Sequence, residues 1–193
     1  MTPALRDEQR HTYEEYLAWP EEARYELIDG LAYAMGPAPL RPHQRIVLEM
    51  ARQIAAAVDG GPCEVNVAPF DVRLPRANEG DELIDTVVQP DIVVVCDRSK
   101  LDDRGCRGAP DWLVEVLSPG SAAHDQVRKL FLYERHGVRE YWLVHPADRI
   151  VTAYRLENGT YGRPLVQELL GTLSSSACPR VEIDWEVVVR GLR

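Results

Sequence analysis

The sequence lacks any apolar run long enough to cross a membrane. A helix that spans a bilayer needs about 18 or more consecutive apolar residues, and no segment of the 193 residues approaches that length. The first residues, MTPALRDEQRHTYEEYLAWPEE, also lack the apolar core of a secretory signal. These two absences predict a cytoplasmic protein with no membrane association.

Cysteine is scarce, and its four positions do not follow the spacing of metal ligands. The residues Cys63, Cys96, Cys106 and Cys178 include no C-x-x-C pair, and the five histidines include no pair at ligand spacing. The pattern therefore gives a zinc site little support. We expect reduced thiols, most of them buried.

Basic residues are outnumbered, with 22 Lys and Arg against 31 Asp and Glu and a net charge of −9. A protein of this charge repels polyanions as a whole, which disfavours avid, sequence-blind binding of nucleic acid. A local basic groove stays open, because several basic residues gather within residues 98–107 and 128–135. They are Arg98, Lys100, Arg104, Arg107, Arg128, Lys129 and Arg135. The alternative is that most of these basic residues are separate, solvated charges on the surface.

The chain contains no internal repeat and no linker, so we expect one domain over residues 1–193. A capping box at Thr12 and Glu15 predicts a short N-terminal helix. Helical spacing of apolar residues predicts two longer helices, over about 43–58 and 121–136, the second with Ser121 as its N-cap.

Strand signals separate these helices. Asp29-Gly30 lies between two short apolar stretches and predicts a hairpin. Further strand patterns cover residues 63–74, 89–96, 111–118, 140–156 and 180–189, with two strands in the fourth of these. Together the elements predict an α/β fold with a central mixed β-sheet flanked by helices, and with an N-terminal helix and hairpin.

Glu115 interrupts an otherwise apolar strand. Its neighbours are Trp112, Leu113, Val114, Val116 and Leu117. An ionised carboxylate that leaves water without a partner costs on the order of several kcal/mol. The strand therefore predicts a cation or hydrogen-bond donors beside Glu115.

Asp91 and Glu115 are predicted to face each other. Asp91 begins one strand and Glu115 lies near the end of the next, so the simplest connection is an antiparallel hairpin with a long loop. In an antiparallel pair, the position numbers of any two facing residues add up to the same total. Asp91 and Glu115 give the same total as the loop ends 97 and 109, so the two acids can face each other. Facing carboxylates repel unless something lies between them. Mg²⁺ fits, because it takes one or two carboxylates and keeps its other positions for water and phosphate.

Lys129 is the candidate third group, which would hold or deprotonate the attacking water. It lies on the helix that follows the Glu115 strand, on the same side as Ala122, Asp125 and Tyr133. The alternative is a surface ion pair between Asp125 and Lys129 at i,i+4 spacing.

These residues form a recognisable pattern. Pro90-Asp91 followed by EVL at 115–117 resembles the PD-(D/E)XK nuclease motif. In addition, the order of several further motifs resembles that of the Uma-two family of restriction-endonuclease-like proteins. These motifs are YELIDG, a His that opens a helix, QPDIVVV, VEVLSPGS, D-x-x-x-K and GVREYWLVHP. The similarity covers the chain from about residue 13 to its end.

The resemblance implies a restriction-endonuclease-like core and a Mg²⁺-dependent endonuclease that hydrolyses DNA, with Mn²⁺ as an alternative ion and a homodimer left open. It makes Asp91 and Glu115 metal ligands and Lys129 the catalytic lysine. The usual lysine lies two residues after the second acid, where this chain has Leu117. The resemblance therefore implies that the lysine has moved onto the following helix.

Glu26 in YELIDG and His43 at a helix start resemble other recurrent polar positions of the family. The functional interpretation gives Glu26 a water-mediated metal contact and His43 a role in substrate positioning or proton transfer. The alternatives are an acid beside the hairpin and a histidine at a helix start.

Two functions remain open from the sequence. One is a metal-dependent nuclease, and the other is a weak or inactive nuclease fold that binds nucleic acid or protein, favoured by the acidic charge and the displaced lysine. If Asp91 and Glu115 need an external cation, replacing Glu115 by Ala should abolish cleavage and stabilise the metal-free fold. A protein cation beside Glu115 would instead make it a structural residue.

Overall fold

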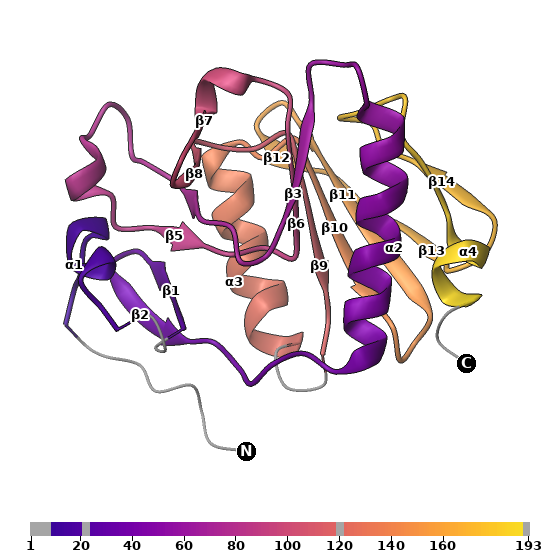
Figure 1. The fold of residues 1–193 in the computed structure, drawn as a ribbon, viewed down its shortest axis with the longest axis horizontal. Coiled ribbons are helices and arrows are strands. Elements are labelled where there is room, and N and C mark those ends of the chain that lie inside the picture. The colour runs from indigo at the N-terminus through magenta and orange to yellow at the C-terminus, as the bar shows by residue number, and fades with distance from the viewer. Residues whose placement is uncertain (1–8, 21–23, 119–121, 191–193) are drawn as a thin grey trace.

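A mixed β-sheet of seven strands lies at the centre of the structure (Figure 1). The structure is a computed structural model that describes residues 9–20, 24–118 and 122–190, apart from the side chains of 122–126. The strands run in the order β12 (Thr160–Tyr161), β11 (Ile150–Glu157), β10 (Glu140–His145), β9 (Trp112–Val116), β6 (Ile92–Val95) and β3 (Glu64–Val67), and β13 (Leu165–Glu168) also pairs with β11.

The two strands that matter for the site are neighbours. β6 and β9 are antiparallel and pair Ile92 with Val114 and Val94 with Trp112. β10 lies parallel to β9 on its other side, so β9 is an inner strand, and all five of its residues are buried. The predicted antiparallel pairing, in the middle of a mixed sheet, is confirmed. The predicted loop between the two strands instead contains a turn at Arg98–Lys100 and two short strands of a second sheet, Leu101–Asp102 and Gly105–Arg107.

The two long helices cover opposite faces of this sheet (Figure 1). Successive strand residues point to opposite faces, so Ile92 and Val114 pack with residues of α2 (Arg41–Val58). The odd-numbered Val93 and Leu113 pack with residues of α3 (Ala122–His136). Both helices lie where the sequence predicts them, and the proposed N-cap Ser121 lies outside the described residues.

A second sheet contains the N-terminal hairpin. Its order is β2 (Leu31–Ala34), β1 (Tyr25–Ile28), β5 (Val87–Val88), β4 (Val72–Arg73), β8 (Gly105–Arg107) and β7 (Leu101–Asp102). Around it lie α1 (Tyr13–Leu17) and the single turns η1 (Asp81–Leu83) and η2 (Arg98–Lys100). Asp29 and Gly30, with φ of +50° and +79°, form the hairpin turn, as predicted from the Asp-Gly pair.

The prediction of one strand over residues 180–189 is wrong in its second half. β15 (Glu182–Asp184) pairs with β14 (Thr172–Ser174), but Trp185–Arg190 form the helix α4. The Asp184 carboxylate accepts a hydrogen bond from the Val187 amide and caps this helix. Trp185 and Val188 are then buried together, so tertiary packing overrides the strand preference of the valine run.

The expectation of reduced cysteines is wrong for one pair. Cys63 and Cys96 form a disulfide, while Cys106 and Cys178 are free and buried. The pairing of β3 with β6 explains the disulfide, because Glu64 faces Val95 and the next residues outward are these two cysteines. The bond therefore follows from strand register, which C-x-x-C spacing does not detect.

None of the helices in the described part of the chain has both the length and the apolar content needed to cross a membrane.

Candidate active site

Asp91 and Glu115 lie side by side at one end of the β6 and β9 pair. Asp91 immediately precedes Ile92, whose partner Val114 immediately precedes Glu115. The register predicted from the sequence is therefore the observed one. Since facing residues of an antiparallel pair share a sheet face, both acids belong to the face that α3 covers.

Lys129 is the protein cation next to Glu115. Its Nζ donates hydrogen bonds to Glu115 Oε1 at 2.9 Å and to Glu26 Oε1 at 2.8 Å. All three residues are buried, with exposed fractions of 4% for Lys129 and 7% for each acid. A surface role for Lys129 is therefore wrong, and the side chain of its proposed partner Asp125 lies outside the described residues.

Tyr133 is a second donor to Glu115. It lies one helical turn after Lys129, and its hydroxyl is 3.3 Å from Glu115 Oε1. Burial raises the pKa of Tyr133 well above its usual value, because the phenolate would lose its hydration. Tyr133 is therefore a protonated donor, and the carboxylate of Glu115 is held by two donors from one helix.

Asp91 is held on its other side by α2 and by the backbone. The carboxylate oxygen Oδ2 accepts a hydrogen bond from the Val116 amide at 2.8 Å and lies 3.1 Å from Nε2 of His43. His43 is buried near the start of α2, and within the described residues its Nδ1 has no hydrogen-bond partner. Both contacts involve Oδ2, so the other carboxylate oxygen of Asp91 points away from His43 and from the Val116 amide.

Glu26 connects the hairpin to the segment that leads into Asp91. Besides Lys129, its Oε1 accepts a hydrogen bond from the Gln89 amide at 2.9 Å. Gln89 lies two residues before Asp91. The predicted site residues Glu26, Asp91, Glu115 and Lys129, with His43, are thus joined through direct contacts or through neighbouring backbone.

Within the described residues, carboxylates outnumber ammonium groups in this cluster. Glu26 and Glu115 share the Lys129 ammonium, and Asp91 contacts the His43 imidazole. Carboxylate oxygens are the ligands that Mg²⁺ prefers. The donor set therefore fits a hard divalent ion at Asp91 and Glu115.

Arg128 was not singled out as a site residue by the sequence. Its guanidinium lies 4.2 Å from the ring centroid of Tyr33, and Tyr33 is the cross-strand partner of Glu26. The buried Nη1 of Arg128 has no hydrogen-bond partner within the described residues. The only advance signal is its position beside Lys129, which does not distinguish it from a surface arginine.

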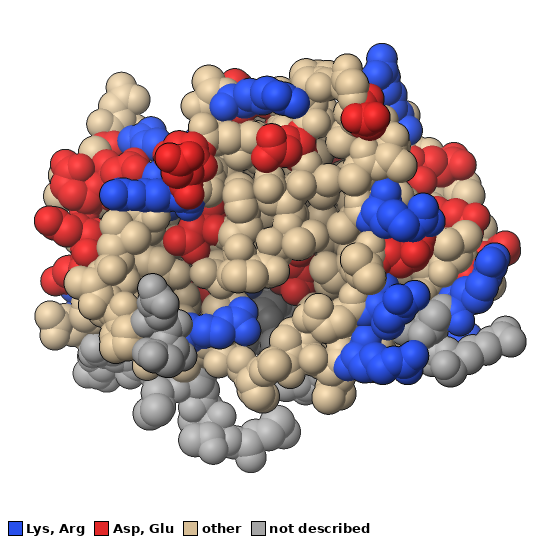
Figure 2. Space-filling view, in the orientation of Figure 1, with Lys and Arg blue, Asp and Glu red and all other residues tan. Residues whose placement is uncertain are grey.

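Three of the other basic residues in these segments have partners within the described residues. Arg107 pairs with Asp81 and Arg135 with Asp29, while Lys100 donates to a backbone carbonyl. On the face shown in Figure 2, acidic side chains gather at the end that carries α1 and η1. These contacts support the surface interpretation for Lys100, Arg107 and Arg135.

Comparison with protein-family models identifies the family of this chain. Residues 13–187 match the Uma2 family model, described as "Putative restriction endonuclease". The chain belongs to the Uma2 family. The match includes every predicted site residue, and the family resemblance read from the sequence is confirmed.

The chain is also similar to a solved structure and to another bacterial protein. A crystal structure described as "a putative nuclease belonging to DUF820", from Anabaena variabilis, superposes with a TM-score of 0.74 at 22% identity, over 94% of this chain and 99% of that one. The described residues therefore have a restriction-endonuclease-like α/β fold. An uncharacterised protein from Synechocystis, slr1290, is 29% identical over 133 residues, which are 68% of this chain and 66% of that protein.

This Uma2 chain departs from the general nuclease motif at Leu117. Leu117 is buried and packs in the same core cluster as Leu113, Leu132 and Tyr133. The position that usually carries the lysine is thus part of the core. Lys129 reaches Glu115 from α3.

Proposed function

We propose that this protein is a divalent-metal-dependent endonuclease that hydrolyses phosphodiester bonds of DNA. The observation that carries the proposal is the group of three carboxylates with one lysine at the end of β6 and β9. Membership of a family described as "Putative restriction endonuclease" supports it.

Asp91 and Glu115 would hold the ion, and Mg²⁺ or Mn²⁺ fits their oxygen donors. When bound, such an ion polarises the phosphate and lowers the pKa of a bound water. His43 and the Val116 amide fix the orientation of Asp91. Lys129 and Tyr133 fix Glu115 in the same way, so both carboxylates are oriented before any ligand arrives.

Lys129 has two tasks in this proposal. It reduces the repulsion between Glu26 and Glu115, and it presents an ammonium close to the place where the water would attack. Glu26 would contact the ion through a water, since its Oε1 already accepts bonds from Lys129 and Gln89. The buried Nδ1 of His43 would position substrate or accept a proton.

A second candidate is a nuclease fold that binds nucleic acid or protein without cleaving it. It is supported by the direct ion pair of Lys129, which makes Glu115 stable without an external ion. The net charge of −9 also opposes tight, sequence-blind binding of DNA.

Plasmid cleavage separates the two candidates. Purified protein is incubated with supercoiled plasmid in Mg²⁺, in Mn²⁺ and in EDTA. The proposed enzyme converts the plasmid to nicked or linear DNA in either ion and does not do so in EDTA. Folded protein that yields no product with any divalent ion, yet retards DNA in a gel, would instead support the binding module.

Arg128 is expected to contact a phosphate of the substrate. A hydrogen bond to a charged group contributes about 1.5–3 kcal/mol, so Arg128→Ala should raise KM on DNA by roughly tenfold or more and change kcat less. Arg135→Ala is the matched control, because Arg135 lies on the same helix and pairs with Asp29. An equal effect of the two substitutions, or an effect on kcat alone, would exclude a phosphate contact by Arg128.

A further inference from the structure

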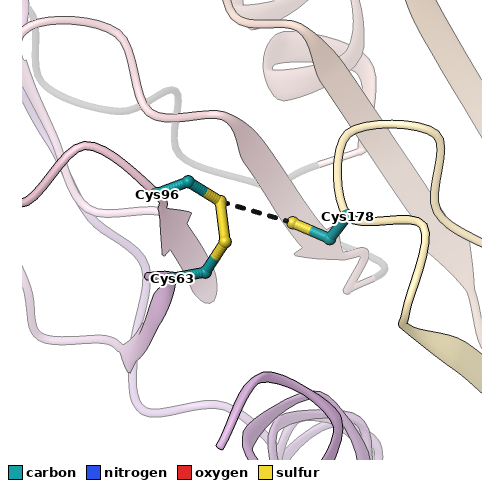
Figure 3. Close-up of side chains that lie close together, drawn as sticks. All are labelled: Cys63, Cys96 and Cys178. Carbon is teal, nitrogen blue, oxygen red and sulfur yellow. Dashed lines mark hydrogen bonds between the residues drawn. A yellow bond between two sulfur atoms is a disulfide. The ribbon is translucent and has the colours of Figure 1, made fainter. Parts of the chain in front are cut away.

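Three cysteines meet at the end of β6 opposite to the candidate active site. Asp91 precedes β6, and Cys96 follows it. Cys63 and Cys96 form the disulfide, and the Sγ atoms of Cys96 and Cys178 are 3.7 Å apart (Figure 3). All three sulfur atoms lie within 4.8 Å of one another. The three residues come from positions 63, 96 and 178, so only the fold brings them together.

The loop that carries Cys178 is fixed by a buried carboxylate. Glu140 of β10 is fully buried, and its Oε2 accepts hydrogen bonds from the Ser175 hydroxyl at 2.6 Å and the Ala177 amide at 2.8 Å. The Cys178 amide donates to Ser175 Oγ at 3.0 Å. Three hydrogen bonds within four residues therefore hold the Cys178 thiol in place beside the sheet.

Cys96 is fixed as well. Its amide donates to Asp111 Oδ2 at 2.7 Å, and Asp111 Oδ1 pairs with Arg139 at 3.0 Å. Cys63 lies at the start of β3, directly outside the pair formed by Glu64 and Val95. The backbone near each sulfur is thus held by strand pairing or by hydrogen bonds to buried acids.

The sulfur positions suit a metal ion. A Zn–S bond is about 2.3 Å long, so two thiolates on one tetrahedral zinc lie about 3.8 Å apart. The distance between Cys96 and Cys178 already has nearly this value. Once the disulfide is opened, small side-chain rotations of Cys63 and Cys96 would bring all three sulfurs to this separation.

We propose that Cys63, Cys96 and Cys178 form a thiolate site for a thiophilic ion such as Zn²⁺, which is available only when the disulfide is reduced. A dithiol reductant supplies two electrons and two protons, opens the bond between Cys63 and Cys96, and becomes a disulfide itself. Binding of the ion then replaces the three thiol protons, which leave to solvent. Three protein ligands leave the fourth position of a tetrahedral ion for water or another small ligand.

Exchange of the disulfide with Cys178 is the competing chemistry for this cluster. In that reaction the Cys178 thiolate would attack Cys96 Sγ, form a new bond and release Cys63 as a thiolate. Exchange requires a thiolate on the attacking residue. The disulfide and the metal site both use the sulfur atoms of Cys63 and Cys96, so the two states exclude each other.

Co²⁺ provides the test, since it can replace Zn²⁺ and gives strong thiolate-to-metal charge-transfer absorption that carboxylate ligands do not give. Reduced and oxidised wild type are first distinguished by counting thiols after denaturation, four in the reduced chain and two in the oxidised one. We expect one equivalent of Co²⁺ to produce this absorption in the reduced protein only, and Zn²⁺ to remove it by displacement.

Variants assign the ligands. The absorption should be lost in reduced Cys178→Ser and Cys63→Ser and kept in Cys106→Ser, since Cys106 lies elsewhere, in β8. Zn²⁺ should also raise the melting temperature of the reduced wild type but not that of Cys63→Ser. Cys63 is half-exposed and Cys178 is buried, so Cys63→Ser should disturb folding less than Cys178→Ser. Reduced wild type with four free thiols and no charge-transfer absorption would overturn the proposal. An unchanged spectrum in both Cys63→Ser and Cys178→Ser would also overturn it. Neither outcome depends on cleavage of DNA.

Discussion

Replacing Lys129 by methionine is expected to lower the free energy of unfolding by about 3–5 kcal/mol, the usual cost of removing one partner from a buried ion pair. Methionine keeps most of the side-chain volume but removes the ammonium. Glu26 and Glu115 would then be buried together without the donor that both now share. Tyr133 would still donate to Glu115, as a neutral hydroxyl.

Urea denaturation measures this loss, and the chain offers a matched control. Its only other lysine is Lys100, which is half-buried and donates to the carbonyl of Ala109. Lys100→Met should therefore cost only about 1 kcal/mol, the contribution of one ordinary hydrogen bond. Equal stability losses in the two variants would show that Lys129 does not act as the cation between the two glutamates.

Asp91→Asn is expected to reduce cleavage of plasmid by on the order of 100-fold or more while leaving the protein folded. Mutating a residue that only hydrogen-bonds to a metal ligand typically lowers metal affinity or activity by about 10–100-fold. Asp91 is proposed as a ligand itself, so its loss should have at least the larger of these effects. Asparagine keeps an oxygen that can accept the Val116 amide, so the local fold should persist. Cleavage rates are measured in Mg²⁺ and in Mn²⁺, with circular dichroism as the check on folding.

Asp97→Asn is the control for this substitution. Asp97 lies beyond the opposite end of β6, is exposed, and accepts hydrogen bonds from Ser99. It carries the same charge at a distance from the candidate site, so its replacement should leave the rate unchanged. A similar loss in both variants would point to general electrostatics instead of metal binding by Asp91.

The contacts of Glu115 reverse one prediction made from the sequence. Two facing carboxylates without a protein cation would gain stability when Glu115 becomes alanine. Lys129 and Tyr133 both donate to Glu115, so its removal takes away a buried acceptor that both donors use, although Lys129 still donates to Glu26. Glu115→Ala should therefore destabilise the metal-free protein, and a stability gain is no longer expected.

The pairing of Asp91 with Glu115 could be predicted because it depends on local rules. The two strands are joined by one loop, and the alternation of side chains fixes which residues face each other. The presence of Lys129 near Glu115 could be predicted for a similar reason, since α3 directly follows β9. These contacts need only the order of the elements and their periodicity.

Other contacts could not be predicted because they join distant segments. Lys129 reaches Glu26 across 103 residues of sequence, and this contact depends on how the hairpin packs beside α3. The meeting of Cys178 with the disulfide depends on a loop held by Glu140. Such contacts are set by tertiary packing, which residue spacing along the chain does not encode.

The central claim is that Asp91 and Glu115 bind a divalent ion in addition to the protein cation that already contacts Glu115. Calorimetric titration of Mg²⁺ into the wild type and into Asp91→Asn tests it directly, because this hard ion does not compete for the cysteine sulfurs. We expect the wild type to bind Mg²⁺ at this site and Asp91→Asn to lose that binding. Absence of binding in the wild type, or equal binding in both proteins, would contradict the claim and leave Glu26, Glu115 and Lys129 as a structural ion-pair network.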